Sequence, residues 1–199
     1  MAKIKYTKSE LKRQKDDLKR FERFLPMLQL KKQQLQLQIR RLDEELRRVA
    51  AERGRLQEEM APWIAVLGGS ENFARWFRLR ELVLGSENVA GVHLPVFEQL
   101  ELEPIRYDLF ETPPWIDRAI QETRSILELD AREHVLRRRR ELIARELIVT
   151  SQRVNLFERV KIPDARENIR RLKIFLGDQQ AAAVVRGKLA KRKLQTVSS

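Results

Sequence analysis

The sequence lacks the residues on which most metal, redox and membrane sites are built. It contains no cysteine, so disulfides and thiolate metal sites are excluded. Its two histidines, His93 and His134, have no partners at metal-binding spacings. No apolar run approaches the ~20 residues that cross a bilayer, and Met1–Arg20 lacks the apolar core of a signal peptide. We therefore expect no metal, no cofactor and no direct membrane insertion.

Catalytic motifs are missing as well. A phosphate loop needs four residues between its first glycine and a Gly-Lys-Ser/Thr end, but Gly177 lies ten residues before Gly187, and Leu189 follows Lys188. The sequence has no Gly-x-Ser-x-Gly motif and no cysteine nucleophile. Most carboxylates are spaced as solvated helix-face charges near basic residues. These absences predict a protein that is not an enzyme.

Charge is what the sequence has in excess. Charged residues make up 35% of the chain, and 41 Lys and Arg against 29 Asp and Glu give a net charge of +12. Typical globular proteins carry about 25% charged residues, so much of this chain is exposed for its length. A net charge of this size predicts an acidic partner, which nucleic acid, an anionic membrane or an acidic protein lining could each supply.

The N-terminal segment, residues 1–63, has the pattern of a coiled-coil helix. Thr7 and Glu10 form a capping-box pattern at its start, in which each side chain bonds the other residue's amide. From Leu11 to Trp63, apolar residues recur at alternating spacings of three and four, with Gln14, Lys32 and Arg53 as exceptions. The predicted seam residues are Leu11, Leu18, Leu25, Leu28, Leu35, Ile39, Leu42, Leu46, Val49 and Leu56.

Prolines and glycines mark where this helix should bend and end. Pro26 removes the hydrogen bond to the Glu22 carbonyl, which predicts a kink. Pro62 and then Gly68-Gly69-Ser70 should end the helix. Residues 8–62 would extend ~80 Å at ~1.5 Å per residue.

The middle segment, residues 64–115, differs in composition and predicts a small β-containing insert. Short strands are expected at Val89–Val92 and Val96–Leu102, and Arg80–Leu84 alternates weakly. Gly85–Asn88 is expected to form the turn between strands. The aromatic residues near this insert suit either local packing or a partner surface; they are Trp63, Trp76, Phe77 and Trp115.

The third segment, residues 116–199, returns to the heptad pattern. Thr112-Pro113 is a helix-start signal just before it. Pro163 should interrupt or kink the helix near Arg159–Ile162. Beyond Arg186 the tail is basic. The predicted seam residues are Ile143, Leu147, Val154, Phe157, Ile169, Leu172 and Leu176.

These segments predict a mainly α fold. A compact insert cannot carry the chain back along a helix of this length, so the second long helix must run antiparallel to the first. The expected fold is a long antiparallel two-helix coiled coil, formed by the N- and C-terminal helices, with a small β-hairpin-containing insert at one end.

Two basic clusters lie on the C-terminal helix. Arg137–Arg140 covers every side of a helical turn, which suits ordinary surface pairing better than a single phosphate-tracking stripe. The second cluster has few acids to compensate it, so it is the better candidate for a partner contact; it comprises Arg186, Lys188, Lys191, Arg192 and Lys193.

Several runs of sequence resemble the D subunit of V/A-type ATPases and ATP synthases. The match covers most of the chain, and residues 149–188 carry its longest part. The matching runs are Thr7–Leu11, Glu87–Val92, Pro95-Val96, Val149–Glu158, Lys161-Ile162-Pro163 and Ile174–Lys188.

The resemblance implies a central rotor shaft. In that family the two terminal helices enter a hexamer of catalytic A and non-catalytic B subunits, and the chemistry stays in the A subunits. The middle region binds the F subunit and docks on the funnel-like subunit that caps the membrane rotor ring. The resemblance thus implies a cytoplasmic protein, peripheral to the membrane, whose tip cluster contacts the hexamer. The expected stalk-partner contacts are Val89, Val92, Val96 and Phe97.

Two other functions remain open on the sequence. A coiled-coil tether or scaffold would form a stable homodimer through the seam. We expect no nucleic-acid partner; the alternative, a basic helical hairpin that binds nucleic acid, would show salt-sensitive binding to DNA or RNA.

Overall fold

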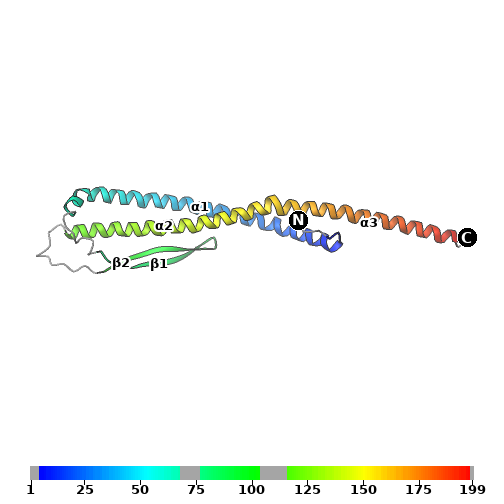
Figure 1. The fold of residues 1–199 in the computed structure, drawn as a ribbon, viewed down its shortest axis with the longest axis horizontal. Coiled ribbons are helices and arrows are strands. Elements are labelled where there is room, and N and C mark those ends of the chain that lie inside the picture. Colours follow the sequence, from blue (N-terminus) through cyan, green and yellow to red (C-terminus); the bar gives the residue numbers. More distant parts are fainter. Residues whose placement is uncertain (1–4, 68–76, 104–115, 198–199) are drawn as a thin grey trace. The chain divides into compact units, whose positions relative to one another are not determined.

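A computed structural model describes residues 5–67, 77–103 and 116–197, with side chains placed for residues 5–61, 77–103 and 116–193 (Figure 1). The predicted fold class is confirmed, because the chain is mainly helical with a two-stranded antiparallel insert. Along the chain the elements are α1 (Lys8–Leu67), β1 (Leu79–Val89), β2 (Val92–Leu102), α2 (Ile116–Leu156), the π-helix η2 (Phe157–Lys161) and α3 (Ile162–Val197).

Helix α1 begins with half of the predicted capping box. The amide of Glu10 donates to Thr7 Oγ1 at 3.2 Å, which satisfies one of the free amides of the first turn. The reciprocal bond is not formed: the Thr7 amide donates to the Lys5 carbonyl at 3.0 Å. The Glu10 carboxylate instead accepts from Gln14 Nε2 at 2.9 Å, so it supports the helix one turn further along.

The prolines of α1 do not end it. The helix continues through Pro26 and Pro62 to Leu67, so the predicted end at Pro62 is wrong. Pro26 is exposed and lies off the seam, where its ring meets solvent rather than a neighbouring helix. The predicted helix start at Thr112-Pro113 and the residues Trp76 and Trp115 lie outside the described residues, as does Gly68-Gly69-Ser70.

The chain divides into two compact units, residues 33–148 and residues 1–32 with 149–199. The first of these contains the hairpin of β1 and β2. Its turn is formed by Ala90 and Gly91, both with positive φ (52° and 82°), between the paired residues Val89 and Val92. This is the two-residue turn that matches the twist of antiparallel strands. Asn88 Oδ1 accepts from the Gly91 amide at 3.0 Å and braces it.

Gly85–Asn88, the segment expected to form the turn, lies inside β1, so that prediction is wrong. Gly85 instead leaves space for a side chain of the neighbouring strand. A Cβ at this position would collide with Glu98 Oε1, so the glycine lets the Glu98 side chain cross the strand. The register shifts between Val83 and Leu84, where β2 accommodates one extra residue as a bulge.

The core of the 33–148 unit joins three elements. Leu35 and Leu42 of α1, Leu94 of β2 and Ile143 of α2 form one buried cluster, in which Leu35 and Ile143 have no exposed surface. The hairpin lies alongside α2 (Figure 1). The turn end of the hairpin is therefore fixed to both helices. Partly buried residues packed against this cluster are Ile39, Val89, Ala90, Val92, Leu136, Leu142 and Leu147.

The other unit is an antiparallel helix pair. Phe21 of α1 meets Phe157 of η2 edge-to-face, with ring centroids 5.3 Å apart. Further toward the start of α1, Asn168 Nδ2 donates to Gln14 Oε1 at 3.5 Å. The rings of Tyr6 and Phe175 also meet, with their centroids 4.8 Å apart. Residue numbers fall along one helix as they rise along the other, which establishes the antiparallel direction.

The π-helix η2 absorbs a one-residue shift of the seam. A heptad continued from Val154 and Phe157 would next place Lys161 and Asp164 inward, but both are exposed. The buried residues are instead Ile162, Ala165, Ile169 and Leu172, each one position later. In η2 the Ile162 amide bonds the Phe157 carbonyl, five residues back, so the turn holds one extra residue. The interruption predicted near Pro163 is thus confirmed as a π turn within an otherwise continuous helix.

Candidate partner-binding surfaces

All of the predicted seam residues are buried or half-buried. Those below one-tenth exposure are Leu35, Leu42, Ile143, Val154, Ile169 and Leu172. Thr150, also a seam position, is 1% exposed. The remaining residues are half-buried, and they are Leu11, Leu18, Leu25, Leu28, Ile39, Leu46, Val49, Leu56, Leu147, Phe157 and Leu176. A seam running the length of both helices stays a prediction that this burial supports.

Two arginines at seam positions are paired with acids of the facing helix. Arg53 Nε lies 2.8 Å from Asp130 Oδ1, and Arg53 Nη1 lies 3.7 Å from Glu133 Oε2. Arg140 Nε donates to Asp43 Oδ1 at 2.6 Å. A charge in a seam is tolerated when such a partner compensates for its lost water. The chain therefore neutralises these seam charges internally.

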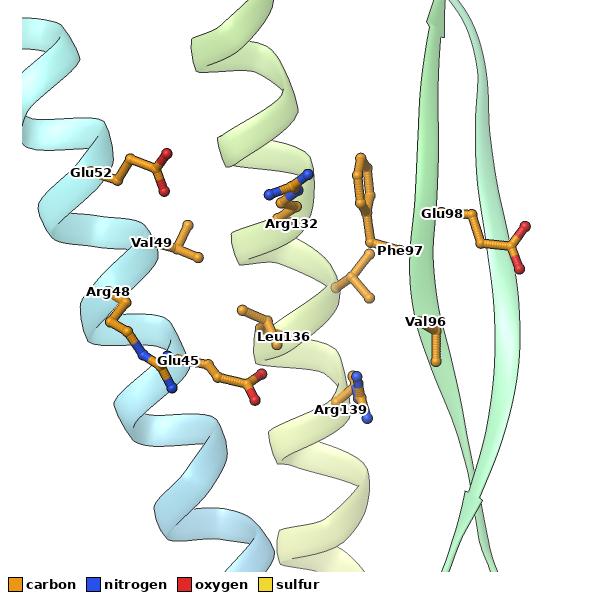
Figure 2. A pocket seen from close by; sticks show the side chains of 11 residues that line it. Glu45, Arg48, Val49, Glu52, Val96, Phe97, Glu98, Arg132, Leu136 and Arg139 are labelled. Atoms are coloured by element: carbon orange, nitrogen blue, oxygen red, sulfur yellow. The ribbon is translucent and has the colours of Figure 1, made fainter.

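A groove runs between α1, α2 and β2, with a volume of about 450 Å³ (Figure 2). Its apolar floor includes Val49, Val96 and Leu136, and charged residues stand at its rim. The Arg132 guanidinium lies over the Phe97 ring, 5.3 Å from its centroid, in a cation–π contact. The remaining lining residues are Glu45, Arg48, Glu52, Glu98, Val135 and Arg139.

An ion pair between Arg139 and Glu87 fastens β1 to α2. The side chain of Arg139 is only 17% exposed, and its Nε is buried without a hydrogen-bond partner among the described residues. Together with the contact between Arg132 and Phe97, this pair holds the hairpin against the helix. Neither contact could be predicted from a local pattern, because residues far apart in the chain supply the two sides.

The four hairpin residues expected to contact a stalk partner face their own chain. Val89 and Val92 pack against the buried cluster, and Val96 and Phe97 line the groove. All four are half-buried, so part of each remains accessible. Leu94 and Leu100, which are 1% and 5% exposed, were not predicted as core residues; their alternate spacing in β2 was the available signal.

The C-terminal half of α3 is a highly exposed stretch of helix. Every residue from Gly177 to Lys193 is exposed. Val184, Val185 and Leu189 each expose more than half of their surface, although they are apolar. The predicted tip residues lie on this stretch and are all exposed: Arg186, Lys188, Lys191, Arg192 and Lys193.

Other basic residues are engaged locally on their own helix. Arg137 pairs with Glu133 and Arg138 with Glu141, so the run Arg137–Arg140 is largely compensated. Hydrogen bonds from Arg170 and Arg171 hold the pKa of the Glu167 carboxyl below its ordinary value. Between Arg186 and Lys193 the sequence contains no acid.

Neither a membrane span nor a metal cluster occurs in the part of the chain that the structure describes. No helix there combines the length and apolar character needed to cross a bilayer. No group of three His, Cys, Asp or Glu side chains converges there in a way that could hold a metal ion.

Comparison with known proteins matches nearly the whole sequence to a single family. The family model for the D subunit of ATP synthase matches residues 10–192. A V-type ATP synthase D subunit of Borreliella burgdorferi is 45% identical over 194 residues, which cover 98% of this chain and 96% of the relative. The V-type ATP synthase D subunit of Chlamydia felis is 34% identical over 122 residues, covering 61% of this chain and 59% of the relative. That of Chlamydia muridarum is 36% identical over 109 residues, covering 55% and 54%.

Proposed function

Because the chain belongs to the family of ATP synthase D subunits, we propose that it is the non-catalytic central-stalk subunit, or rotor shaft, of a V/A-type ATPase or ATP synthase. In this role it couples ATP hydrolysis or synthesis in a hexamer of A and B subunits to rotation of the membrane ring that translocates protons or sodium ions. It is cytoplasmic and joins the membrane only through the complex.

The observation that carries this proposal is the exposed end of α3. A single helix that exposes valines and a leucine on its surface gains little stability from its own hydrogen bonds in water. The exposed stretch Gly177–Lys193 therefore calls for a surrounding partner. A sleeve formed by several subunits covers a helix on every side, whereas a flat partner would cover one face.

The charge of the exposed end of α3 supports a surrounding sleeve whose lining is acidic. The exposed stretch from Gly177 to Lys193 carries five cations and one acid, Asp178. A basic helix is attracted to an acidic lining without a fixed register, because Coulomb forces fall off smoothly with distance. A shaft that passes between three equivalent positions benefits from such contacts, since deep interlocking side chains would hold it in one position.

The hairpin side is the proposed contact for the F subunit and for the funnel-like subunit on the rotor ring. The groove-facing positions of Val96 and Phe97 leave only part of their surface for a partner. The outer strand adds Leu79 and Leu84, which are 60% and 47% exposed. A partner on this side would therefore meet both strands rather than the four predicted residues alone.

Charge reversal at the tip tests the proposal. We expect Arg186, Lys188 and Lys191, all changed to Glu, to lower rotation-coupled ATP hydrolysis in the assembled complex. A matched control changes Arg40, Arg41 and Arg47 to Glu, since these exposed cations lie on α1 and alter the net charge equally. Loss of coupling with the tip variant alone supports the proposal, and equal coupling in both variants contradicts it.

A further inference from the structure

The groove between α1, α2 and β2 has an acidic wall and a basic wall. Glu45 and Glu52 line it from α1, and Arg132 and Arg139 line it from α2. The two members of each pair are seven residues apart, so each pair lies on one face of its helix. Figure 2 shows Glu52 level with Arg132, and Glu45 level with Arg139. Two carboxylates therefore stand opposite two guanidiniums across the apolar floor.

The ion pairs across the seam place the two helices at the same levels. Arg53 of α1 meets Asp130 of α2, and Asp43 of α1 meets Arg140 of α2. Residue numbers thus fall along α2 as they rise along α1. Each of the four groove charges lies within two positions of one of these contacts. The opposition of the two walls therefore follows from the register of the helix pair.

Glu45 and Arg139 leave an acceptor and a donor unused. Arg139 pairs with Glu87 of β1, but its Nε is buried without a hydrogen-bond partner among the described residues. Glu45 is half-buried and makes no ion pair or hydrogen bond within the described part of the chain. Leaving a buried donor unpaired is unfavourable, and a carboxylate that could accept from it lines the same groove. Arg139 therefore has two acids to choose between.

Glu52 and Arg132 repeat this arrangement two helical turns away. The Arg132 guanidinium lies 5.3 Å from the centroid of the Phe97 ring of β2, and it pairs with no carboxylate of the described residues. Glu52 is exposed and is likewise unpaired there. Arg48, which lies on α1 between the two groove carboxylates, pairs with neither of them in the described structure. Each arginine of the basic wall thus holds the hairpin and faces an unpaired carboxylate of α1.

We propose that Arg132 and Arg139 form a latch with two positions, which sets how firmly the hairpin is held. In the position that the structure shows, they hold the hairpin through Phe97 and Glu87. In the second position, their guanidiniums turn across the groove to the two carboxylates of α1, and the hairpin loses both contacts. Rotation about the torsions of the arginine side chains carries the exchange, so the helices need not separate.

The second position loosens the hairpin without freeing it. Leu94 of β2, which is 1% exposed, stays in the cluster that it shares with both helices. The strand β1 loses its ion pair with α2, so its amides exchange with solvent more readily from this state. Anything that favours one position, such as a contact on the hairpin or a twist of the helix pair, shifts the balance between them. The latch lies within residues 33–148 and is independent of the proposed function.

Hydrogen exchange at the β1 amides of the purified full chain, at one pH and one salt concentration, tests the latch. The exchange rate follows the population of the loosened state even when that state is minor. We expect Glu87→Gln, which removes the partner on the hairpin, to speed exchange about two- to fivefold. We expect Glu45→Gln, which removes the competing partner on α1, to slow exchange by about the same factor.

Glu44→Gln is the matched control. Glu44 is an exposed acid next to Glu45 on α1, but it does not line the groove. Its replacement changes the net charge equally, and we expect the β1 exchange rate to stay within about 1.5-fold of the parent. Unchanged or faster exchange in Glu45→Gln would overturn the latch, as would equal slowing in the control.

A double variant separates the latch from a direct effect of Glu45 on the hairpin. Once Glu87 is replaced, Arg139 has no acid on the hairpin, so adding Glu45→Gln should leave the exchange rate within about 1.5-fold of Glu87→Gln alone. Equal slowing by Glu45→Gln in both backgrounds would show that Glu45 acts without Arg139, which contradicts the latch. Circular dichroism melts identify any variant that fails to fold, and Glu52→Gln, measured at the amides beside Phe97, then replaces the Glu45 change.

Discussion

Arg53 of α1 and Asp130 of α2 form an ion pair across the seam, with 2.8 Å between Nε and Oδ1. The two side chains are 37% and 41% exposed, so water screens the pair and its net contribution is modest. Its importance lies in what each residue would do without the other. An unpaired cation at a seam position would oppose the packing of the two helices.

Replacing Asp130 and replacing Arg53 should therefore have different effects on the free energy of unfolding. We expect Asp130→Ala to lower the free energy of unfolding by up to about 1 kcal/mol, because Arg53 then remains at the seam with only the more distant Glu133. Arg53→Leu should be neutral or stabilising, since it supplies an apolar seam residue. Urea unfolding followed by circular dichroism measures both. A larger loss for Arg53→Leu than for Asp130→Ala would show that the pair is a net stabilising contact.

The π turn offers a sharper prediction. Because η2 holds one residue more than an α-helical turn, deleting the exposed Glu158 should convert it to α-helix while both seams keep their phase. We expect this deletion to leave the melting temperature within a few degrees of the parent. Deleting the exposed Arg145 instead shifts Leu147, Thr150 and Val154 off the seam, and we expect a loss of several kcal/mol.

Thermal melts of the two deletion variants test whether the extra residue of η2 serves to keep the seam in phase. If the Glu158 deletion destabilises as strongly as the Arg145 deletion, the extra residue serves something other than seam phase. Pro163→Ala is a useful companion variant. It restores an amide, but the seam shift remains, so we expect the π turn to persist in its structure.

The stability of the hairpin should depend on which residues occupy the two positive-φ positions of its turn. Ala90 has φ of 52°, a region that costs a residue with a Cβ roughly 1 kcal/mol. We expect Ala90→Gly or Ala90→Asn to stabilise the hairpin slightly and Gly91→Val to destabilise it by about 1 kcal/mol or more. Hydrogen exchange at the amides of β1 and β2 reports local opening of the hairpin. Faster exchange in Ala90→Gly would contradict the positive-φ account.

Much of the fold could be predicted from the sequence because heptad spacing reports burial directly. The seam from Leu11 to Leu56 follows one periodicity, and each of its predicted residues is buried or half-buried. The place of the π turn could also be found, since apolar positions after Phe157 step by one residue. Helix ends were less predictable: Pro62 lies within α1, where the helix continues to Leu67.

The hairpin shows why other features escaped prediction. Gly85–Asn88 has the composition of a turn, yet Gly85 lies within β1, where the Glu98 carboxylate of β2 occupies the space that a Cβ would take. The turn itself uses Ala90, which is uncommon at positive φ. Likewise, the exposure of the tip from Arg186 to Lys193 followed from local charge, whereas the inward orientation of Val89 and Phe97 depends on α2, far along the chain.

The central claim is that this chain is an asymmetric shaft in a hexamer, and native mass spectrometry tests it most directly. The chain would be co-expressed with the A, B and F subunits encoded in the same genome, and the intact assembly would be weighed. We predict one copy of this chain and one F subunit per hexamer. A hexamer that assembles without the chain, while the chain forms its own dimer or remains with nucleic acid through purification, would contradict the account.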